Sequence, residues 1–149
     1  MKTLVVYDSL YGNTKAIAQA IGDALPGEVE VLHVSEADAS GLEAYDLLVV
    51  GAPTHGAKPS PEMQGFLDQI QAPALEGVKV ASFDTRMTNK LITMFGVAAP
   101  KIAKALQQKG GTSTGKTEGF CVTGGEGPLK DGEVERAAAW AHGLIGKQA

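Results

Sequence analysis

The fold of this chain is decided near its N-terminus by residues 4–21, which read LVVYDSLYGNTKAIAQAI. Residues 4–7 form a short apolar run, which is typical of a buried strand. Residues 14–25 carry an isoleucine or leucine at every fourth position, which predicts an amphipathic helix. A buried strand, a short loop and a helix in this order predict the first unit of an α/β fold.

The rest of the chain continues this alternation of strand and helix. Short apolar or alternating runs predict further strands at residues 29–34, 47–50, 78–83 and 120–122. Helical spacing of apolar residues predicts helices at residues 61–70, 98–108 and 133–147. Strands interleaved with helices favour a doubly wound α/β domain, a parallel sheet with helices on both faces, over residues 1–149. Ligands in such domains bind at the carboxyl ends of the strands.

The bulk composition excludes several classes of protein. The chain has 149 residues, of which 44% are hydrophobic and 20% charged, as expected for one globular domain. A formal net charge of −4 argues against a nucleic-acid partner, and a single cysteine excludes an internal disulfide. No apolar stretch approaches the roughly 20 residues of a membrane span, and the N-terminal run is too short for a signal peptide. We therefore expect a cytoplasmic protein that does not bind membranes.

The loop after the first strand carries groups that suit a phosphate. Ser9 and Thr14 offer hydroxyl donors, and Gly12 lets the backbone curl so that several N–H groups face one point. The start of the following helix adds partial positive charge. This loop predicts a site where uncharged donors hold a phosphate dianion. A plain helix cap formed by Ser9 or Asn13 is the simpler alternative.

This segment resembles the phosphate loop of the flavodoxin family. The residues that carry the resemblance are Val5, Val6, Tyr7, Ser9, Gly12, Asn13, Thr14, Ala18 and Ile21. The resemblance covers nearly the whole chain, without the insertion in the fifth strand that long-chain flavodoxins have. It implies a five-stranded flavodoxin-like sheet with strand order 2-1-3-4-5, and FMN as the cofactor. The cofactor-binding residues it implies in this loop are Ser9, Leu10, Tyr11, Gly12, Asn13 and Thr14.

The resemblance also implies two loops beside the flavin ring. After the third strand, the implied cofactor-binding residues are Pro53, Thr54, His55 and Gly56. After the fourth strand, they are Asp84, Thr85 and Arg86. In the family, a small residue at the position of Gly56 permits a peptide flip toward the reduced flavin. Neither loop has the Trp or Tyr that many family members stack against the ring, and His55 stands at one such position.

Two interpretations of Arg86 differ in their effect on the flavin. A free guanidinium beside the ring would stabilise the reduced, anionic flavin by Coulomb attraction. The flavin potential would then be less negative than in an aromatic, acidic site. Pairing of Arg86 with a neighbouring acid such as Asp84 is the alternative.

The resemblance implies an FMN-binding electron-transfer protein that docks with a basic redox protein or a reductase, which the negative net charge favours. One alternative is a small FMN-dependent NAD(P)H or quinone reductase, and another is a non-redox module that binds a different phosphate ligand. We expect an electron carrier with no catalytic side chain. We also expect no metal site, since His33 and His142 stand alone in the predicted elements.

A second glycine-rich segment formally matches a nucleotide-binding loop. Residues 110–117 read GGTSTGKT. A nucleotide loop of this pattern follows a strand and opens a helix, whereas here a helix is expected before the segment and a strand after it. The segment is therefore interpreted as a helix stop followed by the polar start of a strand.

Overall fold

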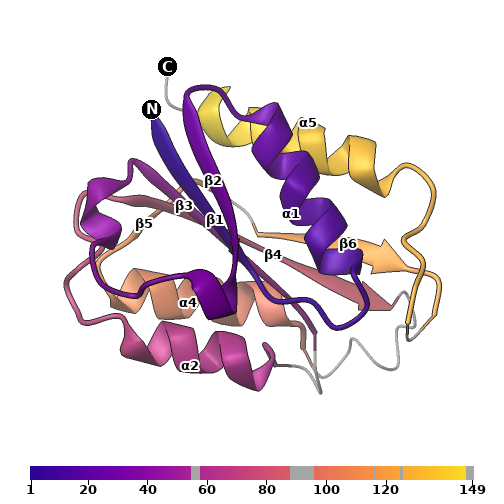
Figure 1. Cartoon of the computed structure of the whole chain (residues 1–149), viewed down its shortest axis with the longest axis horizontal. Helices are drawn as coiled ribbons and strands as arrows, with labels where there is room; N and C mark the ends of the chain where they lie inside the picture. The colour runs from indigo at the N-terminus through magenta and orange to yellow at the C-terminus, as the bar shows by residue number, and fades with distance from the viewer. Residues whose placement is uncertain (55–57, 88–95, 116, 125, 147–149) are drawn as a thin grey trace.

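The computed structural model of the chain describes residues 1–54, 58–87, 96–115, 117–124 and 126–146. It consists of one parallel sheet between two layers of helices (Figure 1). The strands are β1 (Lys2–Tyr7), β2 (Glu28–His33), β3 (Leu47–Pro53), β4 (Lys79–Met87), β5 (Thr112–Ser113) and β6 (Glu118–Val122). The helices are α1 (Asn13–Ala24), α2 (Pro61–Gln69), α4 (Ala98–Gln108) and α5 (Glu133–Gly146), with short 3-10 turns at Val34–Glu36 and Leu42–Ala44.

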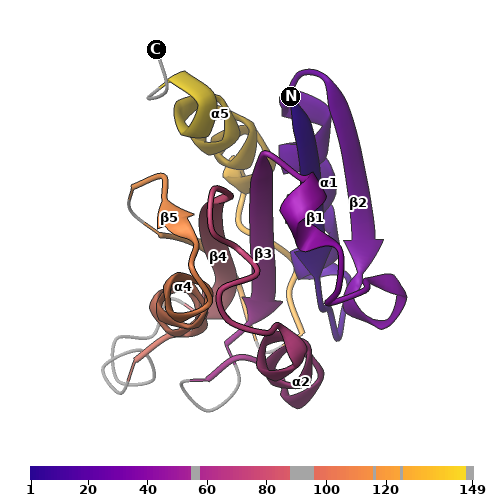
Figure 2. The same cartoon turned by 90° about the vertical axis from the view of Figure 1, so that its left-hand side faces the viewer.

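The strand order is β2-β1-β3-β4-β5, with β6 also paired to β4, and all these pairs are parallel. Figure 2 shows the strands side by side in this order. The predicted doubly wound fold and strand order 2-1-3-4-5 are confirmed. Two strands share the outer position beside β4. β5 pairs with the start of β4, at Lys79 and Val80, and β6 pairs with its later part, beginning at Phe83.

Two apolar clusters hold the layers together, one on each face of the sheet. The cluster beneath α1 and α5 includes Ile17, Ile21, Val49, Phe83 and Ala141. The cluster beneath α2 and α4 includes Leu48, Val50, Met63, Leu67 and Ile102. Alternate residues of β3 therefore enter opposite clusters, which explains why its sequence is apolar without interruption. Trp140 packs against Phe83 and Phe120, with ring centroids 6.1 Å apart in both pairs.

Two strands extend beyond their predicted ends toward the ligand side of the sheet. β3 continues to Pro53 rather than residue 50, and β4 continues to Met87 rather than residue 83. Asp84 and Thr85, predicted in a loop, therefore lie in a strand. They stay in register because β4 is flanked by β3 and by β6, which supply hydrogen-bonding partners on both sides. The sequence does not predict the extension of β4, because strands are located from runs of apolar residues and the end of this strand is polar.

The segment at residues 110–117 has the surroundings expected of a helix stop. α4 ends at Gln108, separated from the segment by one residue, and β6 begins at Glu118, immediately after it. Gly110 adopts a φ of 105°, a left-handed turn that suits glycine. Within the described part of this segment, Thr112–Ser113 form β5, so the interpretation against a nucleotide loop is confirmed.

Two side chains of α5, Glu133 and Arg136, form hydrogen bonds with the backbone of β6. The Cys121 N–H donates to Glu133 Oε2 (2.6 Å), and Arg136 Nη2 donates to the Gly119 carbonyl (2.6 Å). Arg136 Nε and Nη2 also donate to the two carboxylate oxygens of Glu133, at 2.9 and 2.7 Å. The guanidinium lies over the Phe120 ring. The hydrogen bond from Arg136 lowers the pKa of Glu133 below its ordinary value. These contacts satisfy backbone groups that an edge strand would otherwise leave exposed.

Candidate functional site

The carboxyl ends of β1, β3 and β4 surround one open cavity of about 230 Å³. The lining residues are Ser9, Leu10, Tyr11, Asn13, Thr14, Pro53, Thr54, Thr85, Arg86, Met87 and Val122. The tertiary structure thus brings together residues from all three segments that the sequence analysis singled out. Met87 and Val122 were missed, because each ends a strand whose partner strand only the fold supplies. His55 and Gly56 lie outside the described residues.

The loop before α1 leaves donors free at the start of that helix. Gly12 is the N-cap residue with φ 88° and ψ −3°, and its N–H donates to Ser9 Oγ (3.0 Å). The first main-chain bond of the helix runs from the Ala16 N–H to the Gly12 carbonyl (3.1 Å). The N–H groups of residues 13–15 precede that bond, so the helix itself does not use them. They carry the positive end of the helix dipole.

The simpler alternative, a side-chain cap by Ser9 or Asn13, is seen only in part, because Ser9 Oγ accepts from the Gly12 N–H and closes the turn before α1. The cap residue is Gly12, and no side-chain cap bond is formed there. The Asn13 amide instead donates to the Glu126 carbonyl (3.2 Å), which ties the start of α1 to the segment after β6. Leu10 and Tyr11 are 55% and 57% exposed beside the cavity. Tyr11 thus offers an aromatic ring at the cavity, although neither predicted ring loop contains a Tyr or Trp.

Three threonines connect the three segments. The Thr14 and Thr85 hydroxyl oxygens lie 2.7 Å apart and are buried. The Thr54 N–H donates to the Thr85 carbonyl (2.9 Å), and Thr54 Oγ1 accepts from the Ala98 N–H at the start of α4 (3.1 Å). A continuous chain of hydrogen bonds therefore runs from α1 through β4 and the end of β3 to α4.

A buried carboxylate, Asp8, holds the first loop to its neighbours. Asp8 Oδ1 accepts from the Ser9 N–H (2.9 Å) and lies 3.2 Å from His33 Nε2, and the Ser60 hydroxyl donates to Oδ2. His33 Nδ1 accepts from the Ser35 N–H (3.1 Å), so Nε2 carries the proton and donates to Asp8. The expectation that His33 stands alone is wrong. Its partner is distant in sequence and adjacent only because β2 pairs with β1.

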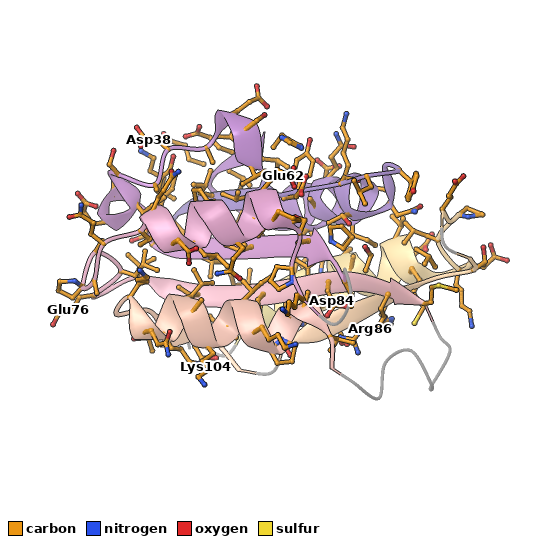
Figure 3. All side chains as sticks on the ribbon, turned by 90° about the horizontal axis from the view of Figure 1, so that it is seen from below. Asp38, Glu62, Glu76, Asp84, Arg86 and Lys104 are labelled. Carbon is orange, nitrogen blue, oxygen red and sulfur yellow. The ribbon has the colours of Figure 1, made fainter. Side chains whose placement is uncertain are left out.

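The second carboxylate, Asp84, is paired with Arg86. Arg86 Nε and Nη2 donate to its two oxygens at 2.7 and 2.8 Å, and the Ala99 N–H of α4 donates to Oδ2 at 2.8 Å. Figure 3 shows both side chains close together on β4. Gly119 of β6 makes room for the guanidinium, since a Cβ there would lie 2.1 Å from Arg86 Cζ.

This ion pair decides between the two interpretations of Arg86. Pairing with Asp84 is confirmed, and the interpretation as a free cation is wrong, because the adjacent carboxylate offsets the charge. The basis for a raised flavin potential is thereby removed. Asp84 is fully buried and, unlike Arg86, is not among the residues that line the cavity. Its carboxylate instead anchors the start of α4.

The described residues contain no group of three or more His, Cys, Asp or Glu side chains placed to hold a metal ion. None of their helices has the length and apolar character required to cross a bilayer.

Comparisons with known proteins agree with this architecture. Residues 4–126 match the family model described as "Flavodoxin domain". The chain is 28% identical to a probable flavodoxin 1 of Bacillus subtilis over 153 residues, covering 97% of this chain and 90% of that protein. It is 30% identical to a flavodoxin of Synechocystis over 122 residues, covering 80% and 69%. The crystal structure of oxidised Flavodoxin 2 from Bacillus cereus superposes with a TM-score of 0.81 at 26% identity, covering 99% of both chains.

Proposed function

This chain belongs to the flavodoxin family and is an FMN-binding electron-transfer protein, and we propose that it holds FMN in the cavity at the carboxyl ends of β1, β3 and β4. The family match favours this function over a self-standing reductase and over a non-redox phosphate-binding module. The observation that carries the proposed site is the convergence of three segments, each implied by the family resemblance, on one cavity.

The donors before and within the first turn of α1 fit the phosphate of FMN. The N–H groups of Asn13 and Thr14 are not used by the helix, and the hydroxyls of Ser9 and Thr14 stand beside them at the cavity. Gly12 brings these groups together through its positive φ. A doubly charged phosphate suits such a site, because backbone donors and the helix dipole favour negative charge there without a paired cation.

The remainder of the cavity fits a flat, largely apolar ring system. Leu10, Tyr11, Met87 and Val122 contribute apolar surface, and Thr54 adds a polar group near the end of β3. When bound, FMN supplies the redox centre that takes up and gives up electrons. The open cavity, with Leu10 and Tyr11 exposed beside it, would leave part of the ring within reach of a partner protein.

The partner we propose is a basic redox protein or a reductase, met in the cytoplasm. The formal net charge of the chain is −4. Opposite net charges speed the encounter of two proteins without requiring a tight complex, which is what a mobile electron carrier needs. The transfer rate to a basic partner should therefore fall as ionic strength rises.

A titration of the FMN-free protein tests the site. Binding should quench the fluorescence of the flavin. We expect FMN to bind more tightly than riboflavin, by about tenfold or more, because only FMN offers charged acceptors to the loop. Ser9→Ala should weaken FMN binding, whereas Ser113→Ala on the exposed β5 should not. Equal affinity for FMN and riboflavin would show that the loop does not hold a phosphate.

Electron transfer is tested separately with the FMN-loaded protein. We expect it to carry electrons from NADPH and a flavodoxin reductase to cytochrome c, a basic haem protein, faster than free FMN at the same concentration. Without the reductase, NADPH should be oxidised slowly. Rapid oxidation of NADPH by the loaded protein alone would instead identify a self-sufficient reductase.

A further inference from the structure

We propose that Thr85 makes the site selective for the phosphorylated flavin, by orienting the Thr14 hydroxyl as a donor toward the phosphate. This inference rests on the proposed FMN site. It moves Thr85 from the ring side, where the family resemblance places it, to the phosphate side. Thr85 is a positioning residue in this account, since it acts through Thr14.

The geometry joins two buried hydroxyls from distant parts of the chain. Thr14 Oγ1 and Thr85 Oγ1 lie 2.7 Å apart, a normal distance for two hydroxyls. Thr14 is 1% exposed and Thr85 is 5% exposed, yet both line the cavity. Thr14 lies in the first turn of α1, beside the N–H groups that the helix leaves free.

The backbone holds Thr85 firmly in this position. β4 is flanked on both sides there, with Thr85 in register with Pro53 of β3 and Phe120 of β6. The Thr85 carbonyl accepts from the Thr54 N–H at 2.9 Å. A hydroxyl on a strand that is paired on both sides can fix the orientation of a neighbouring hydroxyl at the start of a helix.

Counting protons gives the direction of the hydrogen bond. Each hydroxyl carries one proton, and the bond between Thr14 and Thr85 uses one of the two. A phosphate dianion offers only acceptors, so Thr14 must give its own proton to bind it. Thr85 then donates to Thr14, and a chain runs from Thr85 through Thr14 to the phosphate. Each bond in such a chain strengthens the next.

This arrangement discriminates between FMN and riboflavin. Riboflavin ends in a neutral hydroxyl, which can donate or accept and gains little from an oriented donor. A phosphate dianion gains more, because hydrogen bonds to charged acceptors are about twice as strong as neutral ones. Loss of the Thr85 hydroxyl should therefore weaken FMN binding and leave riboflavin binding nearly unchanged.

The experiment measures dissociation constants for FMN and riboflavin by fluorescence quenching. We expect Thr85→Val to lower the preference for FMN over riboflavin about tenfold, and Thr85→Ala, a second hydroxyl-free variant, to do the same. Thr85→Ser keeps the hydroxyl and should keep the preference. Ser82→Ala is the matched control, because Ser82 is a buried β4 residue whose hydroxyl donates to the Ala99 carbonyl at 2.8 Å, outside the cavity.

A double-mutant cycle separates positioning from general damage. In the Thr14→Val background, Thr85→Val should not lower the preference for FMN any further, because the hydroxyl through which it acts is gone. An unchanged preference in both hydroxyl-free variants, equal losses for FMN and riboflavin, or independent effects in the cycle would each overturn the inference. Failure of the unmutated protein to bind FMN would instead overturn the proposed function itself.

Discussion

Replacing Asp8 by asparagine tests whether a buried charge holds the first loop in place. Asp8 is 5% exposed and accepts hydrogen bonds from the Ser9 N–H, the His33 ring and the Ser60 hydroxyl. These donors come from the loop itself, from the end of β2 and from the residue that caps α2. Asparagine keeps the shape of the side chain but has no charge and only one accepting oxygen.

The expected cost follows from how the donors divide between the two oxygens. The asparagine oxygen is best placed at Oδ1, where Ser9 and His33 donate, and both bonds then lose their charge. The amide nitrogen faces Ser60, whose hydroxyl proton loses its acceptor. A bond to a charged group is worth roughly 1 kcal/mol more than a neutral one, so the two weakened bonds account for about 2 kcal/mol, and the lost Ser60 bond adds to this. For a chain of this length, the weakened bonds alone lower Tm by about 6 °C.

The assay is urea denaturation of the FMN-free protein at pH 7, so that cofactor binding adds nothing to the measured stability. Asp46→Asn is the matched control, because within the described residues its exposed carboxylate accepts one bond, from the Lys2 N–H at 2.8 Å. We expect that control to change the free energy of unfolding by less than about 0.5 kcal/mol. If Asp8→Asn unfolds at the same urea concentration as the unmutated protein, the reasoning about this network fails.

Two further predictions concern the elements around the cavity. The hydrogen bond from Arg136 lowers the folded-state pKa of Glu133 below its ordinary value of 4.5, so this group stabilises the fold above that pH. The contribution is lost as pH falls through the lower folded pKa, and Glu133→Gln should flatten the acid limb of a plot of Tm against pH. Gly119→Ala places a Cβ 2.1 Å from Arg86 Cζ, so the guanidinium must move off the fully buried Asp84 carboxylate. Leaving that carboxylate without its cation should cost about 3 kcal/mol in urea denaturation. Gly12→Ala meets no neighbouring atom and should cost only about 1–2 kcal/mol for its positive φ, so equal losses in the two glycine variants would refute the steric argument.

The amino-acid sequence by itself determined the fold and pointed to the strand ends where the candidate site lies. Strands and helices could be predicted because the spacing of apolar residues is a local signal. The helix predicted at residues 98–108 has the same bounds as α4. The first loop was equally readable, since its hydroxyls, its glycine and the helix start lie within a few residues of one another. Local patterns of this kind need no knowledge of which strands are neighbours.

Only the tertiary structure decided which polar side chains are partners. Asp8 contacts His33 because β1 pairs with β2. Thr14 contacts Thr85 because α1 begins beside the carboxyl end of β4. The outer part of β4 looked like a loop, since its polar residues are stabilised by contacts that no local pattern records. Arg86 illustrates this. The sequence allowed either a free cation or an ion pair at this position, and the pair forms because Gly119 on the neighbouring strand leaves space for the guanidinium. Periodicity depends on neighbours along the chain, whereas these contacts depend on strand register.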